Sequence, residues 1–173
     1  MNKHKISWQS FPKSKPCSGF LLSVIGVFES KHAAIASLEN VGQASNDVLA
    51  HLRSGFEFLG FVVESGKTAE SKIRVPVLYG SNGKVEKAFD ADAYHAEQKV
   101  VIEVEAGRAV TNYQFLKDLF QACVMQDVDF LVIAVRQDYR GADDYSKVVA
   151  FLETLYASTR LQLPLKGVLV IGY

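Results

Sequence analysis

The chain has 173 residues, of which 49% are hydrophobic and 22% are charged, a balance typical of a folded globular protein. This composition excludes a disordered or fibrous chain, and the length predicts one domain over residues 1–173 with a core that needs no disulfides. Lysine plus arginine and aspartate plus glutamate each number 19, so the formal charge of zero supplies no whole-molecule attraction to nucleic acid or to an anionic membrane. Any polyanionic partner must therefore be held by a local patch.

The sequence predicts a cytoplasmic protein without a membrane partner. Cys17 and Cys123 are too few for a disulfide framework and lie in no CxxC or Cys/His metal spacing, which predicts reduced thiols. The apolar run at residues 19–28 is followed directly by Glu29, so it predicts a buried element and not a secretory signal. The run is also far shorter than the roughly 20 residues that a membrane helix needs.

The first element with a clear pattern is a helix predicted over residues 46–59. Ser45 and Asn46 are good N-cap residues, apolar residues then recur at helical spacing, and Gly60 is a natural helix end. Residues 1–44, which precede this helix, are expected to form a helical or extended addition to the core.

Three strands joined by two hairpins are expected next. Residues 73–79 alternate between apolar and polar side chains, which is the pattern of a half-buried strand. The Asn-Gly pair at residues 82–83 is a strong hairpin signal, so residues 84–94 should return antiparallel. A second turn near residues 95–98 should lead into an outgoing strand over residues 99–107.

The remaining elements alternate between helix and strand. Residues 112–125 place large apolar side chains on one helical face, and residues 130–135 form a continuous apolar run, as in a strand covered on both faces. A strand, a helix and a strand in this order imply a right-handed crossover with parallel pairing. A further helix at residues 143–158 and a last strand at residues 167–172 complete the mixed sheet of an α/β fold.

Acidic side chains alternate along both strands of the second hairpin. Asp90 and Asp92 share one face of the first strand, and Glu103 and Glu105 share one face of the second. Such carboxylates repel one another unless they are solvated, protonated or neutralised by a cation. An oxygen-only cluster suits Mg²⁺ or Mn²⁺ rather than zinc, and a hard metal held there can activate water and stabilise charge on a phosphate.

The same alternation has a plain alternative, because the solvent-facing side of an antiparallel sheet commonly carries alternating acids. Periodicity alone favours that alternative. Two further features favour a site: the acids lie at the ends of the two most strand-like segments, and Glu103 and Glu105 belong to a strand with apolar residues on both sides.

The spacing of these acids resembles the PD-(D/E)XK motif of the restriction-endonuclease-like superfamily. Asp92 is followed after ten residues by Glu103-Val104-Glu105, a version in which the second strand reads E-x-E. The order of helix, three strands, helix and strand is similar to the superfamily's common core, here over about residues 45–136, with an extra helix and strand at the C-terminal end. The resemblance implies a Mg²⁺- or Mn²⁺-dependent endonuclease that hydrolyses DNA, restriction- or repair-like, and works as a homodimer.

Carried over by position, the resemblance implies that Asp92 and Glu103 bind the metal and that Glu105 is catalytic. Glu105 takes the place of the usual lysine, which orients the attacking water or stabilises the phosphate, although some restriction endonucleases carry an acid there. Lys117, on the following helix, either supplies the missing positive charge as a catalytic residue or is a solvated surface lysine. Supporting or substrate contacts are expected from four further residues: Asp90, Glu57, Gln114 and Arg108.

Two other functions stay open from the sequence. A non-catalytic interaction or regulatory module of the same fold would also lack the lysine that Glu105 replaces. A small-molecule-binding domain has less support because the chain has neither a GxGxxG nor a GxxxxGK[ST] loop. The stretch Tyr139-Arg140-Gly141 follows the strand at residues 130–135, where α/β sheets usually contact ligands, and it is equally consistent with a plain turn.

Overall fold

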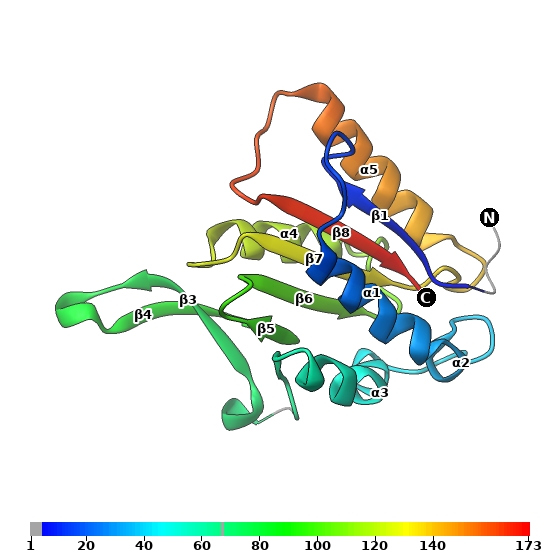
Figure 1. Ribbon diagram of the computed structural model, residues 1–173, viewed down its shortest axis with the longest axis horizontal. Coiled ribbons are helices and arrows are strands. Elements are labelled where there is room, and N and C mark those ends of the chain that lie inside the picture. Colours follow the sequence, from blue (N-terminus) through cyan, green and yellow to red (C-terminus); the bar gives the residue numbers. More distant parts are fainter. Residues whose placement is uncertain (1–4, 67) are drawn as a thin grey trace.

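The computed structural model describes residues 5–66 and 68–173 (Figure 1). In this part of the chain six strands form a central sheet in the order β1-β8-β7-β6-β5-β2, and two more form a separate ribbon. The sheet strands are β1 (Ser7–Phe11), β2 (Val62–Val63), β5 (Ala93–His95), β6 (Val100–Glu105), β7 (Phe130–Val135) and β8 (Gly167–Gly172). The ribbon strands are β3 (Ile73–Tyr79) and β4 (Val85–Ala91). The helices are α1 (Gly19–Ser30), α2 (His32–Ile35), α3 (Ser45–Phe58), α4 (Gln114–Val124) and α5 (Asp144–Ser158).

The sheet is mixed, which confirms the α/β class predicted from the sequence. Strands β6, β7 and β8 run parallel, whereas β5 pairs antiparallel with β6, β2 with β5, and β1 with β8. The parallel pairing of β6 with β7 across α4 is the pairing expected from the strand-helix-strand order. Among residues 5–66 and 68–173, none of the helices has both the length and the apolar character that a membrane span requires.

Helices cover both faces of the sheet, as Figure 1 shows, and alternate side chains of β6 therefore enter two different apolar layers. Ile102 and Val104 pack in the layer that contains α1, α2 and α3, together with Leu52 and Phe56. Val101 points the other way, into the layer of α4, α5 and the ribbon. Each large side chain buried in these layers contributes about 2 kcal/mol to the free energy of unfolding.

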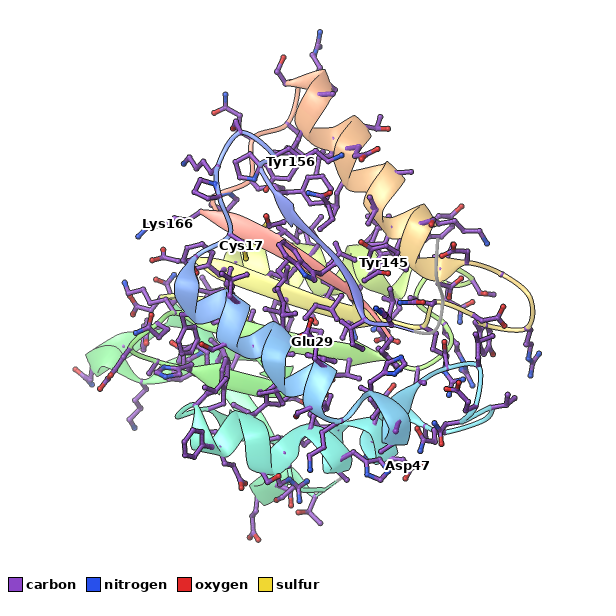
Figure 2. All side chains as sticks on the ribbon, turned by 45° about the vertical axis from the view of Figure 1, so that its right-hand side comes forward. Cys17, Glu29, Asp47, Tyr145, Tyr156 and Lys166 are labelled. Atoms are coloured by element: carbon purple, nitrogen blue, oxygen red, sulfur yellow. The ribbon has the colours of Figure 1, made fainter. Side chains whose placement is uncertain are left out.

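The first core helix begins with a cap supplied by Asp47. Its carboxylate accepts a hydrogen bond from the Ala44 N–H at 3.0 Å, and Figure 2 shows Asp47 at the start of α3. The helix spans the predicted range almost residue for residue, and it buries Val48, Leu52 and Phe56 at the helical spacing that predicted it. The apolar run at residues 19–28, predicted as a buried element, is helix α1.

The structure corrects the prediction of one continuous strand over residues 84–94. The chain pairs with β3 up to Ala91 and then turns at Asp92 into β5, which pairs with β6. At this corner the Asp92 carbonyl accepts the Glu64 N–H at 2.8 Å, and the Asp92 side chain takes a second hydrogen bond from the neighbouring strand. The ribbon therefore leaves the sheet at the point where the first acid of the motif lies.

Candidate functional site

Asp92 is fixed at the corner between β4 and β5 by a short hydrogen bond. Its Oδ2 accepts the Val104 N–H of β6 at 2.7 Å, which orients the carboxylate beside the strand that carries the other two acids of the motif. Burial raises the pKa of Asp92 to about 6, although the bond from Val104 acts in the opposite direction. The nearby charges of Glu64 and Asp118 raise this pKa further.

Glu103 and Glu105 extend from the face of β6 that α4 covers, because they share the side-chain direction of Val101. Burial raises the pKa of Glu103 well above its usual range, and the charges of Asp92 and Asp118 add to the effect. Burial likewise raises the pKa of Glu105 to about 8. The three acids of the predicted motif are therefore brought together, and they are partly buried on the side of the sheet that α4 covers.

Asp118 of α4 completes the cluster, and the sequence reasoning missed it. Its side chain is only 3% exposed, its Oδ1 accepts the Gln114 Nε2–H at 3.3 Å, and its Oδ2 is buried without a fixed protein donor. Burial raises the pKa of Asp118 to about 6, and a protonated Glu105 can donate a hydrogen bond to it. The available signal was its place on the apolar stripe of the helix, between Phe115 and Leu119.

A buried ion pair lies beside the cluster. Glu64, which is 4% exposed, accepts hydrogen bonds through both carboxylate oxygens from Lys72 Nζ, each at 2.8 Å. The negative charge of Glu64 raises the pKa of Asp92, whereas Lys72 lowers it. The sequence reasoning proposed Glu57 as an additional acid from the first helix. The structure places Glu57 on the exposed side of α3, and Glu64, after β2, is the acid whose charge acts on Asp92.

The other predicted site residues fall into two groups. Lys117 and Gln114, one turn apart on α4, lie at the cluster: the positive charge of Lys117 lowers the pKa of Glu103 and Glu105, and Gln114 bonds to Asp118. Asp90 does not join it, because the turn at Asp92 leaves Asp90 exposed in the ribbon, opposite Arg74 of β3.

A pocket of about 670 Å³ opens at the carboxyl ends of β6 and β7, and Glu105 lies at its wall. The predicted substrate residue Arg108 lines this pocket from the exposed loop after β6. Tyr139 and Arg140 line it from the loop after β7, where a bridge between Tyr139 and Ala142 forms a tight turn. The stretch that the sequence left open is thus both a turn and part of a pocket wall.

The pocket wall depends on Gly107, whose φ of 147° is a conformation that favours glycine. A Cβ at this position would overlap the Tyr139 ring. We therefore expect Gly107→Ala to lower the free energy of unfolding by about 1–3 kcal/mol in urea denaturation. Gly26→Ala, in an open position on α1, is the matched control and should raise it by about 0.5–1 kcal/mol. Equal stability of Gly107→Ala and wild type would contradict the fixed position of Tyr139.

The cluster contains only carboxylates, which are the donors that hard divalent cations prefer. Within residues 5–66 and 68–173, however, no three histidine, cysteine, aspartate or glutamate side chains form a group that could hold a metal ion as they stand. The feature that fits a cation is electrostatic: the charge of Asp118 raises the pKa values of Asp92 and Glu103, and the Asp118 Oδ2 is buried without a hydrogen-bond partner.

Comparison with known proteins assigns neither a family nor a function. No protein-family model matches the chain, and neither the curated proteins nor the solved structures contain a match. The function must therefore be inferred from the residues and geometry of the site.

Proposed function

We propose that the chain is a Mg²⁺- or Mn²⁺-dependent endonuclease of the restriction-endonuclease-like kind, which hydrolyses phosphodiester bonds in DNA and acts as a homodimer. The observation that carries the proposal is the convergence of four acids: Asp92 from the corner before β5, Glu103 and Glu105 from β6, and Asp118 from α4. The order of α3, the antiparallel strands, α4 and the parallel β7 supports it, because it follows the order that the motif resemblance requires.

The cluster has an electrostatic reason to bind a cation. Burial and mutual repulsion raise the pKa values of these acids, so the fold bears a free-energy cost when they ionise near neutral pH. A bound divalent cation would offset this cost, and Asp92 and Glu103 are the residues that would hold it. The chemistry that such an ion supplies is the activation of water and the stabilisation of charge on a phosphate.

The residues around the ligands have separate tasks in this proposal. The hydrogen bond from the Val104 N–H holds the Asp92 carboxylate in one orientation. Glu105, with a pKa of about 8 and a place on the pocket wall, is mostly protonated at pH 7 and can take up a proton from an attacking water as its ionised fraction grows toward pH 8. Lys117, exposed on α4 next to these acids, can supply the positive charge that the motif's usual lysine supplies.

The test is cleavage of plasmid DNA with Mg²⁺ or Mn²⁺. Asp92→Asn and Glu103→Gln should each lower the rate by more than about 100-fold, since even contacts outside the ligand shell are worth 10–100-fold at metal sites. Asp90→Asn and Glu57→Gln are matched controls, because both acids are exposed outside the cluster, and they should cut as fast as wild type.

Two results would count against the proposal. Unchanged cleavage by Asp92→Asn would show that the cluster is not the catalytic site. A protein that neither cuts a pool of randomised sequences nor gains thermal stability with Mg²⁺ would instead match the non-catalytic module of the same fold.

A further inference from the structure

The pocket beside Glu105 contains a buried arginine. Arg136 directly follows β7 and is only 4% exposed. Its Nη2 donates to the backbone carbonyl of Gln43 at 2.8 Å and to that of Asn40 at 3.4 Å, whereas its Nε is buried without a hydrogen-bond partner. Across residues 5–66 and 68–173, no carboxylate forms a salt bridge with it. A buried guanidinium with an unused donor is costly unless an anion reaches it.

Two more arginines line the same pocket, so its positive charge is concentrated. Arg108 comes from the loop after β6, and Arg140 comes from the loop after β7, where its guanidinium lies over the Tyr139 ring at 5.4 Å. Two acids also line the pocket. Asp138 is engaged in the turn, with Oδ1 accepting the Gly141 N–H at 3.1 Å, and Glu105 lies where the pocket meets the acidic cluster, so three arginines face two acids here.

Two helices begin at this pocket: the first turn of α4 carries no acid and adds to the positive potential, whereas Asp47 offsets the charge at the start of α3. Ser45 begins α3 and Gln114 begins α4, and both residues line the pocket. The N-terminal end of a helix carries a partial positive charge and is a common place for phosphate to bind.

We propose that this pocket binds a backbone phosphate of the DNA, next to the phosphodiester that lies at the carboxylates. The inference rests on the proposed function and specifies how that function holds its substrate. Guanidinium groups match phosphate oxygens with paired hydrogen bonds, and Glu105 belongs to both the acidic cluster and the pocket wall. A chain with zero formal charge needs such a local patch to hold a polyanion.

The test is the affinity for a fluorescently labelled DNA duplex of randomised sequence, measured by anisotropy with Ca²⁺ in place of Mg²⁺. Arg108→Gln and Arg140→Gln should each weaken binding about tenfold and lower the slope of log Kd against log salt by about one. Arg160→Gln is the matched control and should bind as wild type does. Arg160 follows α5 and Arg140 precedes it, so about 20 Å of helix separates them.

Arg136→Lys keeps the charge but loses the planar fork, and it should weaken binding as well. Because Arg136 is buried, the thermal unfolding of Arg136→Lys is measured before its DNA affinity. If this variant does not fold, the variants at the exposed Arg108 and Arg140 test the proposal. Wild-type affinity in both Arg108→Gln and Arg140→Gln would overturn the proposal, as would an equal loss in Arg160→Gln.

A second arm identifies the source of the phosphate. Inorganic phosphate that stabilises the wild type, combined with no DNA binding, would make the pocket a small-anion site and overturn the proposal. The binding assay needs no turnover. DNA binding that depends on these arginines, without cleavage in Mg²⁺, would refute the nuclease and support the phosphate pocket. Cleavage by the wild type, together with wild-type affinity in the arginine variants, would support the nuclease and refute the phosphate pocket.

Discussion

Glu103→Gln is expected to make the protein more stable at about pH 8.5, although it removes a ligand of the proposed metal site. Burial raises the pKa of Glu103 well above its usual range, so its ionised form is unfavourable in the fold. The glutamine amide has the same shape as the carboxylate but carries no charge, so its burial does not remove a charge from water. We expect the midpoint of thermal unfolding to rise by a few degrees, since a chain of this size shifts about 2–4 °C per kcal/mol.

The direction of the pH dependence follows from the sign of the shifts. An acid with a raised pKa in the fold holds its proton there while the unfolded chain has already lost it, so the stability falls as pH rises through this window. For Glu105 the window runs from about 4.5 to about 8, and for Asp92 and Asp118 from 3.8 to about 6. The wild type should therefore be more stable at about pH 5 than at about pH 8.5.

The measurement is thermal unfolding without divalent metal at both pH values. The gain in stability from Glu103→Gln should shrink at the lower pH, because the wild-type Glu103 carboxyl has less tendency to ionise there. Glu57→Gln, which removes an exposed charge, should leave the unfolding midpoint unchanged at both. A Glu103→Gln variant less stable than wild type at the higher pH would show that the ionised carboxylate is satisfied in the fold.

Lys72→Ala should produce the second large effect, a loss of stability. It removes the only ion pair that neutralises the buried Glu64 among the described residues, and it leaves that carboxylate near the charge of Asp92. Breaking a buried pair from one side costs about 3–5 kcal/mol, and the partial exposure of Lys72 reduces the figure to about 2–3 kcal/mol. The unfolding midpoint should fall by roughly 5–10 °C.

A double variant separates the lost charge from lost packing. Adding Glu64→Gln to Lys72→Ala should recover part of the stability, because no unpaired charge then stays buried. Lys84→Ala, at the exposed tip of the ribbon, controls for the loss of a lysine and should change little. A double variant no more stable than Lys72→Ala alone would contradict the charge explanation.

Local pattern was enough to predict most of the fold from residue 46 onward. The apolar spacing of α3 and α4, the Asn-Gly turn of the ribbon and the continuous run of β7 each depend on residues that are neighbours in sequence. The break at Asp92 could not be predicted this way, because it depends on hydrogen bonds to Glu64 and Val104. The antiparallel β1 was missed for the same reason, since it pairs with β8 at the far end of the chain.

In the candidate site, too, local pattern predicts some residues, and others depend on tertiary contacts. Asp92, at the corner before β5, and the acids on β6 could be grouped because hairpin partners are adjacent in sequence and alternation fixes their faces. Asp118 and Glu64 come to the cluster only through packing: α4 lies over the sheet with its apolar stripe, and Glu64 follows the edge strand β2. The helical period signals that Asp118 is buried, but no local pattern indicates which acids it or Glu64 will meet.

Alternate side chains of strand β6 lie on opposite faces of the sheet, in two different layers. This alternation limits which insertions and deletions the chain can tolerate before β6. Deleting one residue between the turn at His95 and Glu103 would turn every later side chain of β6 to the opposite face of the sheet. Glu103 and Glu105 would then enter the apolar layer under α3, and Val104 would enter the face that now holds the acids. The tip of the ribbon, at Ser81–Gly83, carries no such constraint. Insertions and deletions among natural variants of this chain should therefore accumulate at the ribbon tip and be absent from the segment that leads to the E-x-E pair.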